Sequence, residues 1–289
     1  MIITKIRLQE EHPMTVSGVS WPLTQIDLDL NPFAGDNGYK IMAVQGLDPP
    51  DLISIVEGFD SNGVPIFDNV ASDKSLTFKI ELKPGIGQSY GSLRDDLYKY
   101  VGRSICISLM NGSIIVGQTT GYINRFESDV FSNKPNVIIN VECFSEDFYS
   151  PYPVSIPLSE LATAQPKIVY ENGTAPTGLD LQFTVTSPTA SFSFSNYGKF
   201  WYSGTTDVST LFQVTYPLIV GDVVTIKTYK KEKRINLLRS SSNYDLAGYI
   251  NSGAVWPKLF SGVNVFDWTI LSAWATINSA SYTPRYWGV

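Results

Sequence analysis

Few residues in this chain of 289 could carry out nucleophilic chemistry. A Ser–His pair needs a positioned imidazole, and His12, which stands directly before Pro13, is the single histidine. Cys106 and Cys143 are the two cysteines, and they fall on different expected strands without Cys-x-x-Cys spacing. One histidine and two separated cysteines cannot make the usual tetrahedral set around zinc. We therefore expect His12 to be a solvent-exposed loop residue and both cysteines to be buried free thiols.

Oxygen ligands and carboxylate pairs offer two further chemistries. Asp27-x-Asp29-x-Asn31 begins like a calcium loop, but Pro32 stands where such a loop needs a glycine for its sharp turn, so we expect an exposed strand face. Glycoside hydrolysis uses two carboxyl groups, and the sequence offers three candidate pairs: Asp95 with Asp96, Glu127 with Asp129, and Glu146 with Asp147. Because a sequence gives no distances, a hydrolase remains a hypothesis and no catalytic or metal-binding residue is assigned.

Two segments resemble sites for phosphate. Gly85-x-Gly87-x-x-x-Gly91 lies between an expected strand and an expected helix, but its spacing is neither that of a dinucleotide fold nor that of a Walker loop. Lys230-Lys-Glu-Lys-Arg234 is the one basic run, and on a β-hairpin such a run is typical of a solvated tip that discourages edge pairing. We expect a flexible loop, a hairpin tip, and no cofactor.

The tryptophans gather in the second half of the chain, where they could fill a core, form a subunit contact or stack on sugar rings. We favour the core or contact interpretation and keep a sugar-binding surface as the alternative. The candidate ligand or interface residues are Trp201, Trp256, Tyr286 and Trp287.

Alternating apolar and polar residues indicate that the elements holding these side chains are mostly strands. In the first half they are expected at 26–30, 39–44, 52–56, 76–82, 105–110, 113–118, 122–126 and 137–144. Asn111-Gly112 predicts a tight hairpin turn. The one expected helix has Ser92 as its cap, Leu93, Leu97, Tyr100 and Val101 on its buried face, and Gly102 just past its end.

The second half is again β, with strands expected at 179–186, 190–195, 208–215, 223–229, 234–238 and 269–277. This spacing, with almost no helix, is typical of a sandwich. A proline-rich stretch from Ser150 to Pro166 has no clear period. We therefore expect two domains, residues 1–153 and residues 154–289.

Composition narrows the function classes. Hydrophobic residues make up 43% and charged residues 17% of the chain, which predicts folded rather than disordered domains. The net charge of -6 argues against specific nucleic-acid binding through phosphate and against a polybasic membrane contact. No apolar run reaches 18 residues and the start of the chain turns charged at once, so we expect no membrane insertion, no signal peptide, and assembly in a cytoplasm.

Several motifs resemble those of the siphophage distal tail protein family. At the end of the chain these are Trp256-Pro-Lys-Leu259 with Gly262 and Asn264, and Tyr282-Thr-Pro-Arg-Tyr-Trp-Gly-Val289. In the first half they are Gly46-Leu-Asp-Pro-Pro50, Leu93-Arg-Asp-Asp-Leu-Tyr98, Gly121-Tyr-Ile123, and Val141-Glu-Cys-Phe144 with Phe148. The ranges 197–207 and 239–251 show no such pattern.

This resemblance implies an all-β protein with one short helix: an N-terminal split β-barrel of tail-tube type followed by a galectin-like β-sandwich. It implies a structural protein of the virion tail tip that forms a homo-hexameric ring. That ring would join the tail tube protein to the tail-tip hub and carry receptor-binding or other baseplate proteins. No catalysis is implied, and an acidic chain suits a conduit through which DNA must slide without sticking.

Overall fold

The computed structural model describes residues 3–11, 15–16, 19–20, 24–30, 38–49, 52–59, 65–71, 74–129, 135–161, 167–170, 173–198, 208–267 and 274–288. For 15–16, 19–20, 52–59, 65–71, 167, 169, 194–198, 208–210 and 267 only the backbone is described.

The chain folds into two compact units. The first consists of Met1–Ile53, Ala71–Pro151 and Tyr286–Val289, and the second of Ser54–Val70 and Tyr152–Arg285. The expected domains are continuous ranges, whereas neither of these units is. The chain leaves the first unit at Pro151 and returns to it for its last residues.

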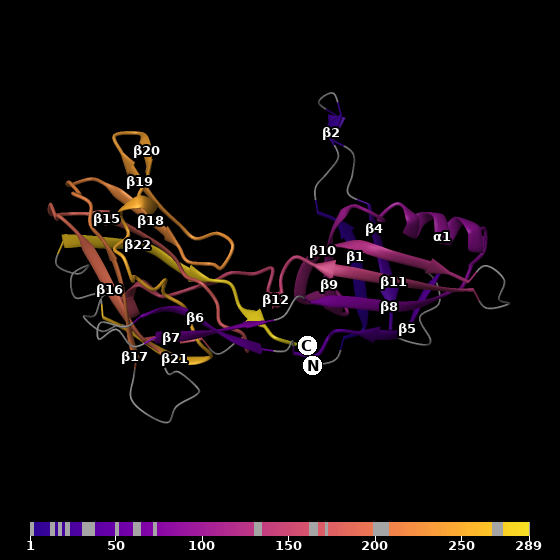
Figure 1. Cartoon of the computed structure of the whole chain (residues 1–289). Coiled ribbons are helices and arrows are strands. Elements are labelled where there is room, and N and C mark those ends of the chain that lie inside the picture. The colour runs from indigo at the N-terminus through magenta and orange to yellow at the C-terminus, as the bar shows by residue number, and fades with distance from the viewer. Residues whose placement is uncertain are drawn as a thin grey trace. The chain divides into compact units, whose positions relative to one another are not determined.

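The first unit is built on a barrel. Its strands are β1 (Lys5–Glu10), β4 (Gln25–Asp29), β5 (Tyr39–Gln45), β8 (Ser75–Leu82), β9 (Ser104–Asn111), β10 (Ile114–Ser128), β11 (Asn136–Cys143), β12 (Phe148–Tyr149) and β23 (Arg285–Tyr286). Seven of them are hydrogen-bonded in the order β11-β8-β5-β4-β1-β9-β10, and β10 pairs back to β11, so the barrel closes (Figure 1). The predicted all-β barrel is confirmed, and β12 and β23 extend its sheet beyond β10.

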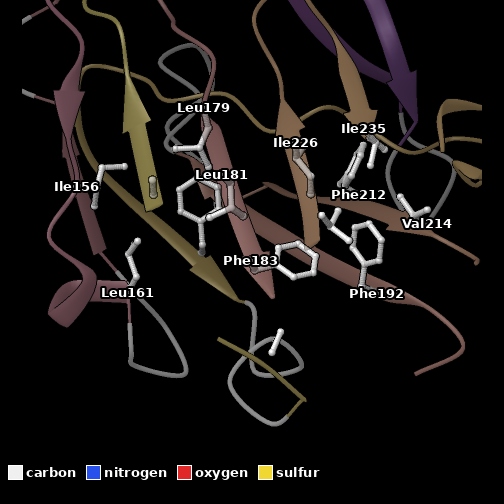
Figure 2. Packing of buried hydrophobic residues seen from close by; sticks show 14 of the residues in the cluster. Ile156, Leu161, Leu179, Leu181, Phe183, Phe192, Phe212, Val214, Ile226 and Ile235 are labelled. Atoms are coloured by element: carbon white, nitrogen blue, oxygen red, sulfur yellow. The ribbon is translucent and has the colours of Figure 1, made fainter. Parts of the chain in front are cut away.

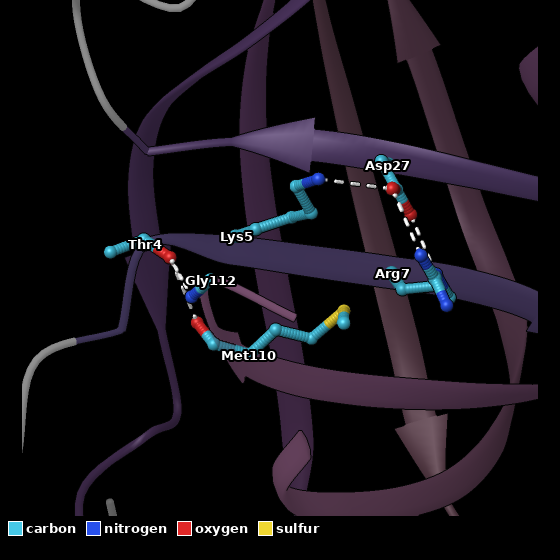
Figure 3. A network of polar contacts seen from close by, with 6 residues as sticks. All are labelled: Thr4, Lys5, Arg7, Asp27, Met110 and Gly112. Carbon is cyan, nitrogen blue, oxygen red and sulfur yellow. Dashed lines mark hydrogen bonds and ion pairs between the residues drawn. The ribbon is translucent and has the colours of Figure 1, made fainter. Parts of the chain in front are cut away.

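Charge alternation explains how β1 and β4 find their register. Ile6 and Leu8 point into the barrel with 0% exposure, while Arg7 points outward opposite Asp27 of β4. The Arg7 guanidinium donates to both oxygens of Asp27, at 2.7 and 3.1 Å, and Lys5 Nζ donates at 3.2 Å (Figure 3). Cross-strand opposite charges stabilise a register in this way. Strand β1 was not predicted, although its residues alternate between buried and less buried at the start of the strand.

The barrel has one weak seam. Strands β4 and β5 are parallel and are paired through a single residue pair, Asp29 with Lys40. By contrast, β1 pairs with β4 over five residues and with β9 over six. The pairing is short because β4 and β5 run in the same direction and overlap only at the end of β4 and the start of β5.

The predicted helix is confirmed as α1 (Tyr90–Tyr98), but it begins earlier than expected. The cap is Ser89 and not Ser92: the Ser89 hydroxyl accepts from the Ser92 amide at 3.0 Å, and the Ser92 hydroxyl accepts from the Ser89 amide. Serine therefore occupies both ends of a capping box, where glutamate is usual at the second position. Leu93 and Leu97 are buried as expected.

The end of this helix segment differs from expectation at one residue. Tyr100 is 1% exposed, as expected, but Val101 is 41% exposed and does not share the buried face. Gly102 does adopt positive φ, +74°, as predicted. The second helix, α2 (Leu158–Leu161), is four residues long and was not predicted.

Two details of the β9–β10 hairpin correct the sequence analysis. Ile114 pairs with Asn111, so the two-residue turn is Gly112–Ser113 and not Asn111–Gly112. Gly112 takes φ +61°, which fits the glycine-first pattern of a type II′ turn. The expected strands 113–118 and 122–126 form one continuous strand, β10, because residues 119–121 between them pair with Ile105–Ile107 of β9.

The larger part of the second unit is a sandwich of two sheets. The first contains β13 (Val154–Ser155), β22 (Ala275–Tyr282), β15 (Asp180–Val185), β18 (Val223–Lys227), β19 (Arg234–Arg239) and β20 (Ser242–Asp245) in that order. The second contains β14 (Lys167–Tyr170), β21 (Gly262–Asp267), β16 (Phe192–Gly198) and β17 (Val208–Val214). A 3-10 helix, η1 (Ala247–Tyr249), follows β20.

The two sheets share one core. Phe183 and Ile226 of the first sheet belong to the same buried cluster as Phe192 and Phe212 of the second (Figure 2). Phe183 and Phe192 meet edge to face, with ring centroids 5.7 Å apart. The expected sandwich is thus present as two facing sheets around an aromatic core.

At the rim of this core a buried carboxylate is held by an arginine. Asp222, 1% exposed, accepts from Arg239 Nε at 2.9 Å and Nη2 at 2.6 Å, and from the Ile219 amide at 2.9 Å. Burial alone would raise the pKa of Asp222, but these hydrogen bonds outweigh it and lower that pKa.

Several strands of the second unit were not expected from the sequence: β13, β14, β20 and β21. The expected strand 269–277 corresponds to β22, which runs from Ala275 to Tyr282, while 268–273 lie outside the described residues. Two small hairpins complete the described strands: β2 (Thr15–Val16) with β3 (Val19–Ser20), and β6 (Leu52–Phe59) with β7 (Pro65–Ala71).

Candidate functional site

The residues weighed for metal binding and nucleophilic chemistry do not come together. His12 and Asn31 lie outside the described residues. Asp27, the first residue of the calcium-like run, is bound by Lys5 and Arg7, which hold its pKa below the usual range of a carboxyl group (Figure 3). No cluster of three potential metal ligands occurs within the ranges that the structure describes. Also within these ranges, no helix has the length and apolar character needed to cross a membrane.

Both cysteines are free thiols in protected positions. Cys143 is buried at the end of β11, and Cys106 is half-buried on β9. Burial raises the pKa of Cys143 to about 11 and also raises that of Cys106. Since the thiolate is the nucleophile, both are poorly reactive near neutral pH.

Two of the candidate carboxylate pairs, Asp95 with Asp96 and Glu127 with Asp129, lie on the surface. Asp147 of the third pair is 5% exposed and accepts a hydrogen bond from Ser145 Oγ at 2.6 Å. Asp96 is paired with Lys99 at 2.6 Å, and Glu127 is paired with Arg125. Glu127 and Asp129 do line one hollow of about 350 Å³, together with Lys79, Ser128, Asn136 and Ile138.

The glycine loop and the basic run take ordinary turn conformations. Gly87 has φ +82° in the loop before α1, whose first residue is Tyr90. The basic run forms the turn between β18 and β19, with Arg234 opposite Lys227. Lys233 Nζ lies 5.8 Å from the ring centroid of Trp256, which makes a cation–π contact.

Of the four candidate ligand or interface residues, Trp201 lies outside the described residues. Trp256 is half-buried and packs against the sandwich core, its ring centroid 5.0 Å from that of Phe212. Tyr286 and Trp287 belong to the first unit, and Trp256 belongs to the second.

Tyr286 and its neighbours anchor the end of the described chain to the barrel sheet. Strand β23 pairs with β12, and the Tyr286 ring packs against the barrel core. The Trp287 carbonyl accepts a hydrogen bond from Lys74 Nζ at 2.9 Å. We call Lys74, Tyr286, Trp287 and Gly288 the anchor.

Gly288 makes the closest approach in the anchor. A Cβ atom at this position would lie 2.9 Å from the Leu47 carbonyl oxygen and 2.9 Å from the Pro49 nitrogen, both of them backbone atoms. In the same turn Gly46 takes φ +87°, and a Cβ there would lie 2.0 Å from the Ser75 carbonyl. Two motifs that resemble the tail protein family, near residue 46 and at the end of the chain, thus meet in space.

Lys74 is the buried charged residue of the anchor. It is 4% exposed, and its Nζ lies 4.2 Å from the ring centroid of Phe148. Burial lowers the pKa of Lys74, opposed by the nearby Cys143, Asp147 and Asp48. A buried ammonium is costly unless it is paired. Lys74 was not predicted as a functional residue, since a lone lysine before a strand carries no signal of burial.

No family model matches the sequence, and no curated protein matches it. Among solved structures, the chain is similar to the crystal structure of the SPP1 Dit protein, with a TM-score of 0.54 and 12% identity over 99% of both chains.

Two further similar structures are those of the phage P2 baseplate in its activated conformation, one with calcium and one with strontium. Their TM-scores are 0.42 and 0.41, at 8% and 9% identity, with 98% or more of each chain covered. At such low identity the likeness to SPP1 Dit shows the fold alone. The chain has the all-β fold of a phage Dit protein along almost its entire length, as the resemblance in its sequence implies.

Proposed function

We propose that this chain is a structural distal tail protein of a long, non-contractile phage tail and is not an enzyme. The observation that carries the proposal is its likeness to SPP1 Dit over 99% of both chains, which includes both compact units and not one shared domain. The SPP1 protein is described as a paradigm of the hub adsorption apparatus in phages that infect Gram-positive bacteria.

In this proposal six copies form a ring at the tip of the virion tail. The ring joins the tail tube protein to the tail-tip hub and carries receptor-binding or other baseplate proteins. The first unit supplies the ring-forming barrel, and the second unit supplies a galectin-like sandwich. The net charge of -6 favours a passage for DNA without adhesion. Assembly takes place in the cytoplasm of the bacterial host.

Light scattering and electron microscopy of the purified protein test the proposal. We expect a particle of six times the mass of the chain and a ring with six-fold symmetry in negative stain. Since ring assembly depends on concentration, the measurement covers a range from low to high micromolar protein. A strict monomer throughout, with no ring when the tube or hub protein is added, would count decisively against it.

A carbohydrate-binding function is the second candidate, and one feature of the sandwich favours it. Tyr216 and Tyr249 meet edge to face at 4.7 Å, and Tyr249 and Tyr244 are 49% and 44% exposed. Exposed tyrosine rings can stack on sugars. Calorimetry with host cell-wall polysaccharide should show binding that Tyr249→Ala weakens at least tenfold. Tyr98→Ala, at a residue 47% exposed in the other unit, is the control and should leave binding unchanged. If the unmodified protein does not bind the polysaccharide, this candidate function is ruled out.

A further inference from the structure

Two exposed aromatic rings lie beside a carboxylate on the β10–β11 pair. Tyr122 of β10 is 36% exposed, and Phe144, which directly follows β11, is 42% exposed. Their ring centroids are 5.9 Å apart, with an angle of 33° between the ring planes. Glu142 stands opposite Tyr122 in the pairing of the two strands and is partly exposed. We call Tyr122, Glu142 and Phe144 the aromatic–acid patch.

Two hydrogen bonds hold the Glu142 carboxylate in place through one of its oxygens. The Tyr122 hydroxyl donates to Oε2 at 2.6 Å, and Asn124 Nδ2 is a longer donor to the same atom at 3.4 Å. The bond to Glu142 raises the pKa of Tyr122, so the phenol remains a donor at neutral pH. Within the described part of the chain the other oxygen, Oε1, accepts no hydrogen bond. The carboxylate is therefore oriented but keeps an acceptor for a further donor.

The patch is electron-rich and lacks a cationic partner. Three other carboxylates of the barrel strands form ion pairs within the chain: Asp27, Glu81 and Glu127. Glu142 forms none with the residues that the structure describes. The two rings add to its negative potential, because the face of an aromatic ring carries the negative part of the ring quadrupole. A site of this kind favours a cationic ligand over a neutral one.

We propose that the aromatic–acid patch is a docking site for an arginine side chain of another protein. A guanidinium can stack on the Tyr122 or Phe144 ring and donate an N–H to Oε1 of Glu142. A quaternary ammonium has no N–H for that oxygen, and a lysine ammonium has no flat face for the rings. The inference goes beyond the proposed ring, because the patch is complete within one chain.

Most arginines of the described residues are already engaged, which favours another protein as the source of the guanidinium. Those that form ion pairs within the chain are Arg7, Arg94, Arg103, Arg125 and Arg239. Docking one of these in a second copy would break the ion pair that it has. An unpaired arginine on the surface of a different protein carries no such cost, so this is the partner that fits the patch.

Fluorine NMR of the purified protein, with labelled tyrosine and phenylalanine, tests the site. The probes are two capped pentapeptides of glycine whose central residue is arginine in one and citrulline in the other. Citrulline keeps the shape of arginine without its charge. The arginine peptide should shift the Tyr122 and Phe144 signals and bind at least fivefold more tightly than the citrulline peptide. Added salt should narrow this difference, because it screens exposed charges.

Glu142→Gln removes the charge with little change of shape and should weaken binding of the arginine peptide at least fivefold. Phe144→Ser, which removes one ring, should weaken binding similarly. Glu81→Gln is the matched control on the adjacent strand β8, since Glu81 is paired with Lys40 and Lys83, and it should leave binding unchanged. Circular dichroism confirms that each variant keeps its fold.

Equal affinity for the two peptides, no binding of either, or binding that Glu142→Gln leaves unchanged would show that the patch is not an arginine site. A larger response to a neutral disaccharide such as cellobiose would assign the rings to sugar recognition and would also overturn the proposal. A loss of self-association in Glu142→Gln would place the patch between copies of the chain and contradict the choice of partner. Ring formation by the unmodified protein is measured separately, so the proposed function and the arginine site can fail independently.

Discussion

The carboxylate of Asp222 shows what one buried charge requires of its surroundings. Arg239 binds both of its oxygens and also donates to the Pro217 carbonyl at 2.9 Å, so the pair fixes the turn before β18. Removing one member of a buried ion pair costs more than the pair contributes, because it strands the other charge.

Arg239→Met should therefore lower the free energy of unfolding of the second unit by about 3 kcal/mol. The check is hydrogen exchange in urea, which reports each unit separately. Lys227→Met is the matched control, since it breaks the more exposed pair with Asp180 and should cost less than about 1 kcal/mol. Equal costs at the two sites would contradict the role given to burial.

Asp27 links the stability of the barrel to pH. Arg7 and Lys5 lower its pKa in the folded state, so the folded chain is stabilised above the unfolded pKa of about 3.9. This stability is lost as pH falls through the lowered folded pKa. Asp27→Asn should therefore destabilise the protein at pH 6 by on the order of 1 kcal/mol and by less at pH 3. Denaturation at both pH values measures it; a cost independent of pH would refute the linkage.

At the scale of elements, the β9–β10 and β19–β20 hairpins turn through different backbone conformations. In the β9–β10 turn Gly112 carries positive φ, and Ser113 does not. In the β19–β20 turn both residues do: Ser240 has φ +46° and Ser241 has φ +68°. Each non-glycine residue in this region costs roughly 1–2 kcal/mol.

Ser241→Gly should consequently stabilise the second unit by about 0.5–1 kcal/mol, and adding Ser240→Asn should give the favoured Asn-Gly turn. Ser113→Gly makes the same substitution where φ is not positive and should be neutral or destabilising. Thermal unfolding of the three variants compares them. Stabilisation by both glycine substitutions would mean that backbone strain is not the cause.

Patterns of local alternation predicted the central strands well and the marginal ones poorly. Strands such as β8 and β11 alternate strictly between buried and less buried residues, and both were predicted within one residue at each end. By contrast, all four residues of β20 are exposed, so no apolar period marks it. The positions of β14 and β21 depend on pairing with each other across almost a hundred residues of chain, which no local pattern contains.

On the scale of the whole molecule, the contacts of the anchor likewise could not be predicted from local sequence patterns. The resemblance singled out Tyr286, Trp287 and the turn at Gly46, but it gave no reason for them. Their roles come from contacts between residues more than two hundred positions apart, such as Lys74 with Trp287. Only the folded chain reveals that a lysine must be buried where the final residues return.

The anchor predicts a local effect of a small substitution. Gly288→Ala places a methyl group 2.9 Å from two backbone atoms of the Leu47–Pro49 turn, which cannot easily move. It should destabilise the first unit by about 1–3 kcal/mol and leave the second unit unaffected. Gly248→Ala is the control, because no atom lies within 4 Å of its Cβ position. Hydrogen exchange measures the stability of each unit separately. Equal stability of the two variants would contradict the role given to Gly288 in the anchor.

The pairing of β12 with β23 also says something about how such a chain can change. The second unit's long segment, Tyr152–Arg285, begins three residues after β12 and ends on the first residue of β23, and these strands are hydrogen-bonded neighbours. The two ends of this segment therefore lie side by side. Evolution or protein engineering could replace the segment with another domain whose termini are close together, because the barrel would keep every strand that it needs to close.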